Sequence, residues 1–231
     1  MRYSWILFDA DETLFHFDGF AGLKYMFASL GVDFSPQDYQ AYQERSAPLW
    51  INYQNGVISA AELQHQRFQD WSKRLTVSTE QLNSDFLAAM AKVSPPLPGA
   101  VELISSLQDK AQLGIITNGF TAMQQERLAY AGWQDTFSPL VISEEVGIAK
   151  PDVGIFEHAF HLMGNPPKEQ ILMVGDNPHS DILGGLNAGI DTCWLNASGD
   201  RAPANIQPHY EVGSLNQLQQ LLLSENKTHH G

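Results

Sequence analysis

The chain has 231 residues, of which 43% are hydrophobic and 17% are charged, and its formal net charge is −13 at pH 7. This composition is too apolar for a disordered tail, and the length is sufficient to bury a full core. The negative charge argues against a nucleic-acid or anionic-membrane partner, because the average field of the surface would repel either one. The sequence has neither a signal-peptide pattern nor an apolar run of membrane-spanning length, so we expect a cytoplasmic protein.

Four short apolar runs predict the strands of one sheet. Each run is continuous rather than alternating, as expected for parallel strands that are buried on both faces. The runs are residues 5–8, 113–116, 171–174 and 192–195. Helical patterns lie between them, with apolar positions at Val101, Ile104 and Leu107 and at Ile155, Phe156, Ala159, Leu162 and Met163. This alternation predicts an α/β fold with a doubly wound, Rossmann-like parallel sheet.

The interval 17–93 has no comparable strand run and contains a series of helix starts. Ser35 precedes a proline in the way that a helix cap does, and Ser59 and Glu62 form a capping-box pattern. Ser78 precedes a further helix. One face of that helix carries Leu82, Phe86, Met90 and Val93. The interval is therefore predicted to be a helical insertion.

The insertion is expected to end at residues 94–99, where three prolines cannot continue a helix. We therefore predict an α/β core formed by residues 1–16 and 94–231, with the helical insertion at 17–93. The chain end at 227–231 is expected to be frayed, and its histidines are given no functional role.

Two aspartates follow the first predicted strand, at the edge where open α/β sheets bind ligands. Asp9 and Asp11 repel each other there, and a divalent cation would explain why that repulsion is tolerated. A solvated acidic loop would explain this pair alone equally well. Asp176 and Asp181 add two more carboxylates after the strand at 171–174. Four acids at one edge predict a hard-cation site, and oxygen-only ligands suit Mg²⁺ better than zinc or copper.

Thr117, Asn118 and Gly119 follow the strand at 113–116, where a hydroxyl and successive backbone N–H groups can bind phosphate oxygens at a helix start. Alone, an Asn-Gly pair is more often a simple turn. Lys150 precedes a proline, in a chain with only 13 lysines and arginines. A lysine in such a place is ordinarily an exposed residue of a loop. Both segments therefore become evidence for a phosphate site only through their order along the chain.

These segments, in this order, resemble the four motifs of the haloacid dehalogenase superfamily, and the helical insertion resembles its cap of the first type. The resemblance implies that Asp9 attacks phosphorus and forms an aspartyl-phosphate. It implies that Asp11 protonates the leaving alkoxide and later deprotonates the water that hydrolyses the intermediate. The dehalogenases of this superfamily lack an aspartate at the Asp11 position, so a phosphatase or a mutase is favoured.

The same resemblance implies a Mg²⁺ ion, for which Mn²⁺ or Co²⁺ can substitute. Its ligands would be the Asp9 carboxylate, the Asp11 backbone carbonyl and Asp176, with Asp181 ordering their surroundings. The phosphoryl oxygens would be held by Thr117, Asn118 and Lys150. Elementary electrostatics agrees, because a carboxylate approaches a phosphate dianion only where nearby cations cancel the charge.

Ala10 and Glu12, together with residues 48–50, 53–56 and 141–147, resemble the corresponding segments of bacterial pyrimidine 5′-nucleotidases. This closer resemblance implies that the substrate is a small phosphate monoester such as UMP, dUMP or dTMP. A phosphosugar phosphatase or mutase stays open as an alternative. A non-catalytic binding module is disfavoured because every residue needed for turnover is present.

Substrate choice is expected to lie in the insertion, because the motif residues contact only the phosphate. Phe17, Trp50 and Tyr53 are candidates to stack on the base, and the amide of Gln54 or Asn55 offers hydrogen bonds. The alternative is that these aromatic residues form the hydrophobic core of the insertion itself.

Overall fold

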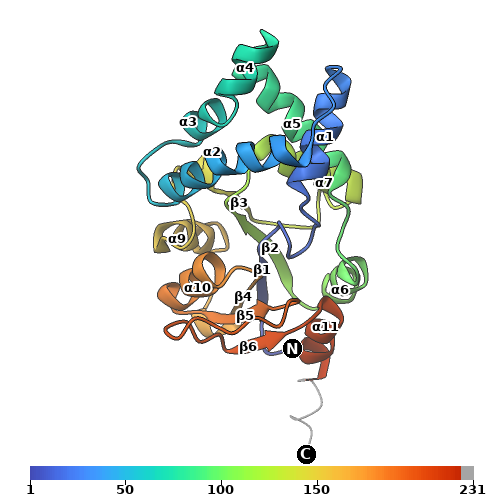
Figure 1. Cartoon of the computed structure of the whole chain (residues 1–231). Coiled ribbons are helices and arrows are strands. Elements are labelled where there is room, and N and C mark those ends of the chain that lie inside the picture. Colours follow the sequence, from blue (N-terminus) through green and yellow to red (C-terminus); the bar gives the residue numbers. More distant parts are fainter. Residues whose placement is uncertain (225–231) are drawn as a thin grey trace, which may run out of the picture.

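The computed structural model describes residues 1–224, and the frayed end predicted at 227–231 lies outside the described residues. Within the described range, six parallel strands form one sheet in the order β3-β2-β1-β4-β5-β6. They are β1 (Trp5–Phe8), β2 (Gln112–Thr117), β3 (Leu140–Ile142), β4 (Ile171–Gly175), β5 (Asp191–Leu195) and β6 (Tyr210–Val212). Helices lie on both sides of this sheet, and a further group of helices lies above it (Figure 1). The predicted doubly wound α/β fold is confirmed.

The four inner strands of the sheet coincide with the four predicted apolar runs. β1 lies at the centre, so that Phe8 is level with Ile115 on β2 and with Val174 on β4. The prediction missed β3 and β6, which form the two edges and have three residues each. Strands this short do not give an apolar run that stands out from the neighbouring loops.

Helices outside the insertion cover the two faces of the sheet. They are α6 (Ala100–Leu107), α7 (Thr121–Ala131), α8 (Ser143–Val146), α9 (Val153–Leu162), α10 (Leu183–Ala188) and α11 (Leu215–Ser224). Ile6 and Phe8 of β1 pack in one hydrophobic cluster with α6 and α11, whereas Leu7 packs in another with α9 and α10. Successive residues of a strand point to opposite faces, so both faces of β1 are buried.

Two apolar positions of the predicted helical patterns lie at the surface. Val101 is 50% exposed and Leu162 is 55% exposed. In α6, the buried stripe begins at Ala100 and continues through Leu103, because residues three and four apart share a helix face. At the end of α9, the following residue Met163 takes the buried position instead of Leu162.

The helices of the insertion are α1 (Gly19–Ser29), α2 (Pro36–Gln54), α3 (Ala60–Gln66), α4 (Gln69–Leu75) and α5 (Thr79–Val93). The predicted caps at Ser35, Ser59 and Ser78 are confirmed, since each side chain accepts a backbone N–H of its first turn. The apolar side chains of these helices form their own cluster, which Phe120 and Met123 join from beside and within α7. In residues 1–224, no helix combines the length and the apolar character that crossing a membrane requires.

Candidate active site

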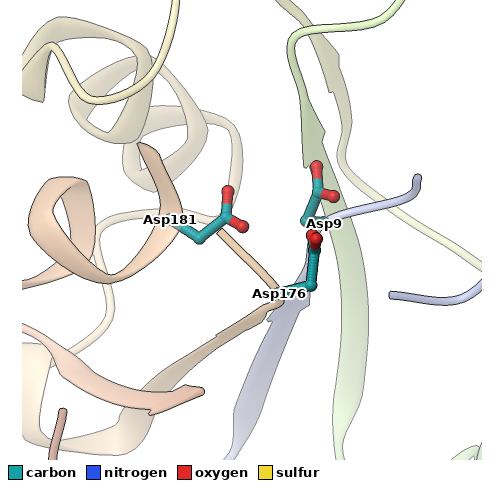
Figure 2. Close-up of side chains that lie close together, drawn as sticks. All are labelled: Asp9, Asp176 and Asp181. Atoms are coloured by element: carbon teal, nitrogen blue, oxygen red, sulfur yellow. The ribbon is translucent and has the colours of Figure 1, made fainter. Parts of the chain in front are cut away.

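Two central strands bring the predicted acidic residues together. Asp9 follows β1 and Asp176 follows β4, and these paired parallel strands end at the same edge of the sheet. A π-helical turn, η2 (Pro178–Ile182), returns Asp181 to this edge. One carboxyl oxygen from each of Asp9, Asp176 and Asp181 lies within 4.8 Å of the others, and Figure 2 shows the three side chains gathered in one place.

Local contacts fix the loop that follows β4. The Asp176 N–H donates to Thr13 Oγ1 at 3.0 Å, and the Asn177 N–H donates to Asp181 Oδ2 at 3.0 Å. Gly175 leaves room for this arrangement, because a Cβ at that position would overlap the Asp181 carboxylate. The Gly-Asp-Asn segment therefore folds so that the carboxylates of Asp176 and Asp181 approach Asp9.

Lys150 is a buried cation in contact with this cluster, and its side chain is 1% exposed. Its Nζ lies 2.6 Å from Asp9 Oδ1 and 2.7 Å from Asp181 Oδ1, and it also donates to the Ile116 carbonyl at 2.6 Å. Burial by itself would lower the pKa of Lys150, but the carboxylates of Asp181 and Asp9 outweigh burial and raise it. Lys150 is therefore held as an ammonium ion beside Asp9.

The carboxylates outnumber the ammonium group at this site. Burial raises the pKa of Asp9 to about 7; attraction to Lys150 opposes this rise, whereas repulsion from Asp181 and Asp11 adds to it. Burial, followed by repulsion from Asp9 and Asp181, raises the pKa of Asp176 to about 8. A divalent cation would supply the charge that lets both groups ionise, and a donor set made only of oxygen atoms fits Mg²⁺.

Asn118, which follows β2, holds the backbone of Lys150 by two hydrogen bonds. The Asn118 side chain accepts the Lys150 N–H at 2.8 Å and donates to the Lys150 carbonyl at 2.9 Å. Thr117 is 1% exposed, and its Oγ1 accepts the Gly119 N–H at 3.0 Å. The side-chain amide of Asn118 thus positions Lys150, and its predicted contact with phosphate stays a prediction.

A cavity of about 310 Å³ lies over this cluster and combines motif residues with residues of the insertion. Its polar lining consists of Asp9, Asp11, Glu12, Thr117, Asn118, Lys150, Asp176, Asn177 and Ser180. Its other lining side chains are Phe17, Trp50, Gln54, Arg67, Phe86, Leu87, Phe120 and Met123. The arrangement can hold a metal ion and an anionic group beside a surface of aromatic and other largely apolar side chains.

The sequence model of the haloacid dehalogenase-like hydrolases matches residues 3–189. The chain belongs to this family. The membership predicted from the motifs is therefore confirmed, and with it the hydrolase class. This hydrolase is 53% identical over 222 residues to pyrimidine 5′-nucleotidase YjjG of Escherichia coli, a match that covers 96% of this chain and 99% of that protein.

Two further relatives of this haloacid dehalogenase-like hydrolase match over nearly the whole chain. Pyrimidine 5′-nucleotidase PynA of Streptococcus pneumoniae is 35% identical, and the match covers 94% of each protein. The crystal structure of the putative HAD-hydrolase YfnB of Bacillus subtilis, bound to magnesium, superposes with a TM-score of 0.81 at 28% identity. That superposition covers 96% of this chain and 99% of that one.

Of the four predicted substrate-binding residues of the hydrolase, Phe17, Trp50 and Gln54 line the cavity. Tyr53 is not among the residues that line it. Tyr53 is 7% exposed, and its hydroxyl donates to Ser143 Oγ at 2.7 Å. The Trp50 and Tyr53 rings meet edge to face, so Trp50 borders the cavity while Tyr53 joins α2 to α8.

Arg67, which no sequence pattern marked as a site residue, lines the cavity although it is only 3% exposed. Its guanidinium carbon lies 5.2, 5.0 and 5.1 Å from the ring centroids of Phe68, Phe86 and Phe120, respectively. Its Nε and Nη2 donate to the Asn83 side-chain carbonyl. Among residues 1–224, no carboxylate oxygen lies within the 4.0 Å ion-pair distance of this guanidinium. Glu144 attracts this guanidinium from beyond that distance. A buried cation that makes no close ion pair, beside a cavity, is a candidate ligand-binding group.

Arg127 on α7 was also missed, and it forms a buried ion pair with Asp11. Its partner is 116 positions away in the sequence, so no local pattern announces the contact. The available signal was weaker: Gln124 and Arg127 lie three residues apart, on the same helix face as the buried Leu128.

Proposed function

We propose that the protein is a magnesium-dependent 5′-nucleotidase that hydrolyses UMP, dUMP and dTMP. The observation that carries this proposal is a cavity in which a carboxylate cluster with a buried lysine adjoins an aromatic wall. The 53% identity with a pyrimidine 5′-nucleotidase, over 96% of the chain, supports the choice of substrate. The alternatives, a phosphosugar phosphatase or mutase, would not need the aromatic wall.

Asp9, Asp176 and the Asp11 backbone carbonyl would hold Mg²⁺, with Asp181 beside them. Support comes from the close approach of three acidic side chains that offer only oxygen donors. Bound Mg²⁺ supplies positive charge where negative charge accumulates on the transferring phosphoryl group. We extend the proposal to Mn²⁺ and Co²⁺, because both accept the same oxygen ligands.

In the first step, a carboxylate oxygen of Asp9 attacks phosphorus, the bond from phosphorus to the nucleoside O5′ breaks, and Asp11 gives its proton to O5′. In the second step, water attacks the phosphorus of the aspartyl-phosphate while Asp11 takes a proton from that water. The bond from phosphorus to the Asp9 oxygen breaks, which releases phosphate and restores the Asp9 carboxylate. Lys150 lies 2.6 Å from Asp9, so its charge stabilises the phosphoryl oxygens beside the attacking atom. Thr117 and the backbone after it hold the same oxygens.

The nucleoside would occupy the part of the cavity that the insertion contributes. Trp50 and Phe120 lie 5.2 Å apart, centroid to centroid, with an angle of 34° between the rings. Such a wall favours a planar base, on which aromatic side chains stack. Arg67 and Gln54 add N–H donors that match the carbonyl oxygens of uracil and thymine. These contacts favour a pyrimidine nucleotide over a bare sugar phosphate.

We propose further that residues 17–93 form a cap over a catalytic core of residues 1–16 and 94–231. Phe17, Trp50 and Arg67 would then read the nucleoside from the cap while the core carries the phosphoryl chemistry. The net charge of −13 supports a free nucleotide rather than a nucleic acid as the substrate. The cytoplasm is proposed as its place of action.

A phosphate-release panel tests the proposal. With Mg²⁺, we expect kcat/KM for UMP, dUMP and dTMP to exceed that for ribose 5-phosphate about tenfold or more, because ribose 5-phosphate has the phosphate and a sugar but no base. A chelator should remove activity, and added Mg²⁺ should restore it. A preference for sugar phosphates would support the phosphosugar alternative, and activity that survives the chelator would contradict the metal site.

A further inference from the structure

Arg127 makes a buried contact with Asp11 that the reaction described above does not use. Its side chain is 1% exposed, and its Nη1 lies 2.5 Å from Asp11 Oδ1. One turn earlier on α7, Gln124 Oε1 accepts Arg127 Nε at 3.0 Å and Nη2 at 2.6 Å. The guanidinium carbon also lies 4.5 Å from the centroid of the Phe15 ring. The guanidinium is thus fixed by its own helix and by an aromatic ring where it meets Asp11.

Burying the Arg127 guanidinium and the Gln124 amide costs free energy that their contacts must offset. A buried guanidinium needs an anionic partner, and in the described part of the chain the carboxylate within 4.0 Å of Arg127 is that of Asp11. Gln124 gives its acceptor to Arg127 although its own Nε2 is buried without a partner among the described residues. The Gln124 amide is therefore oriented so that its oxygen accepts hydrogen bonds from Arg127.

The ion pair leaves the second carboxylate oxygen of Asp11 near Gly119, in the segment that follows β2. A Cβ placed on Gly119 would lie 3.4 Å from Asp11 Oδ2 and 3.2 Å from Thr117 Oγ1, and closer still to Gln124 Nε2, so both oxygens and the Gln124 amide face Gly119. The Asp11 side chain is 28% exposed, so its surroundings do not enclose it completely. Holding its Oδ1 therefore keeps its Oδ2 on the side of Gly119.

We propose that Arg127 is a positioning residue that, together with Gln124, fixes Asp11 so that Oδ2 delivers the proton to the leaving oxygen. This inference rests on the proposed function, because it takes Asp11 as the general acid. Arg127 itself lies outside the residues that line the cavity. A purely structural arginine would support all substrates equally, whereas a positioning residue matters only where a proton must be delivered.

Two leaving groups separate these roles in the Arg127→Met protein. The nucleoside of dTMP leaves as an alkoxide that needs a proton, whereas p-nitrophenolate leaves without one. We expect single-turnover release of thymidine to slow about 100-fold or more. The pre-steady-state burst of p-nitrophenol from p-nitrophenyl phosphate should change less than about threefold, which also shows that the variant is folded. Arg127→Lys should recover part of the thymidine rate.

The controls use one reference variant and one matched surface variant. Asp11→Asn should show the same selective loss, and the double variant with Arg127→Met should be no slower on dTMP than Asp11→Asn alone. Arg74→Met, at a side chain that is 61% exposed, should match the wild type on both substrates.

Equal losses on both substrates, or an unchanged thymidine rate, would overturn the positioning role. If the wild-type enzyme does not hydrolyse the nucleotides but hydrolyses another alkyl phosphate, the proposed nucleotide substrate is refuted. The comparison with p-nitrophenyl phosphate would then test Arg127 with that alkyl phosphate.

Discussion

Replacing Asp9 by asparagine should lower the kcat for phosphate release from dTMP about 10⁴-fold or more, because an amide cannot supply the anionic oxygen that attacks phosphorus. The fold should remain intact. Burial raises the pKa of Asp9 to about 7 in the folded protein, so ionising this group above that pH opposes folding. The metal-free Asp9→Asn protein should therefore match or exceed the wild-type Tm at pH 8.

Steady-state phosphate release and thermal unfolding, measured on the same preparation, check both parts of this expectation. Asp109→Asn is the matched control, because Asp109 is exposed and lies in the turn before β2, whereas Thr117 is at the other end of that strand. It should leave the kcat unchanged. A folded Asp9→Asn protein that retains a tenth of the wild-type kcat would rule out Asp9 as the nucleophile.

Replacing Lys150 by methionine should affect both catalysis and stability. Removing a cation from beside the phosphoryl oxygens should lower kcat about 10²- to 10³-fold. The change also leaves the carboxylates of Asp9 and Asp181, 2.6 and 2.7 Å from Nζ, without their buried ion pair. Losing one partner of a buried pair typically costs about 3 to 5 kcal/mol in the free energy of unfolding.

The stability loss should depend on pH and on metal. Attraction to Lys150 opposes the rise in the pKa of Asp9, so the variant raises that pKa further. A raised carboxyl pKa gives stability that is present at low pH and is lost as the pH rises through the folded-state value. In chelator, the Tm of Lys150→Met should therefore fall more steeply between pH 6 and 8 than that of the wild type.

Adding Mg²⁺ should recover part of the Tm that Lys150→Met loses, because a bound cation replaces some of the missing positive charge. Lys73→Met, at an exposed position on α4, is the control and should behave as the wild type does. A Lys150→Met protein with the same Tm loss at both pH values and no response to Mg²⁺ would contradict the electrostatic account of the site.

The sequence sufficed for those parts of the molecule in which burial leaves a local pattern. The inner strands are buried on both faces and therefore appear as continuous apolar runs. Asp9 and Asp176 could be brought together because each follows such a strand, and parallel strands end at one edge. The edge strands β3 and β6 have three residues each and leave no comparable run.

The missed parts of the site depend on contacts between distant segments. Arg127 meets Asp11 across 116 positions, and Arg67 is held by an asparagine 16 positions away. Tyr53 has an aromatic ring of the kind that stacks on a base. Its hydroxyl instead donates to the hydroxyl group of Ser143, 90 positions away. Which side chain of a helical insertion borders a cavity is decided by tertiary packing, and residue type alone does not reveal it.

The central claim is that phosphoryl transfer proceeds through Asp9. The most direct measurement is an acid quench of the Asp11→Asn protein during its first turnover of p-nitrophenyl phosphate with Mg²⁺. This leaving group needs no proton, but hydrolysis of the intermediate lacks its base, so the phosphorylated enzyme should accumulate. We predict a burst of p-nitrophenol that matches the number of active sites, with the phosphoryl group on the peptide that contains Asp9. The same burst with the phosphoryl group on another residue, or as free phosphate alone, would contradict the account.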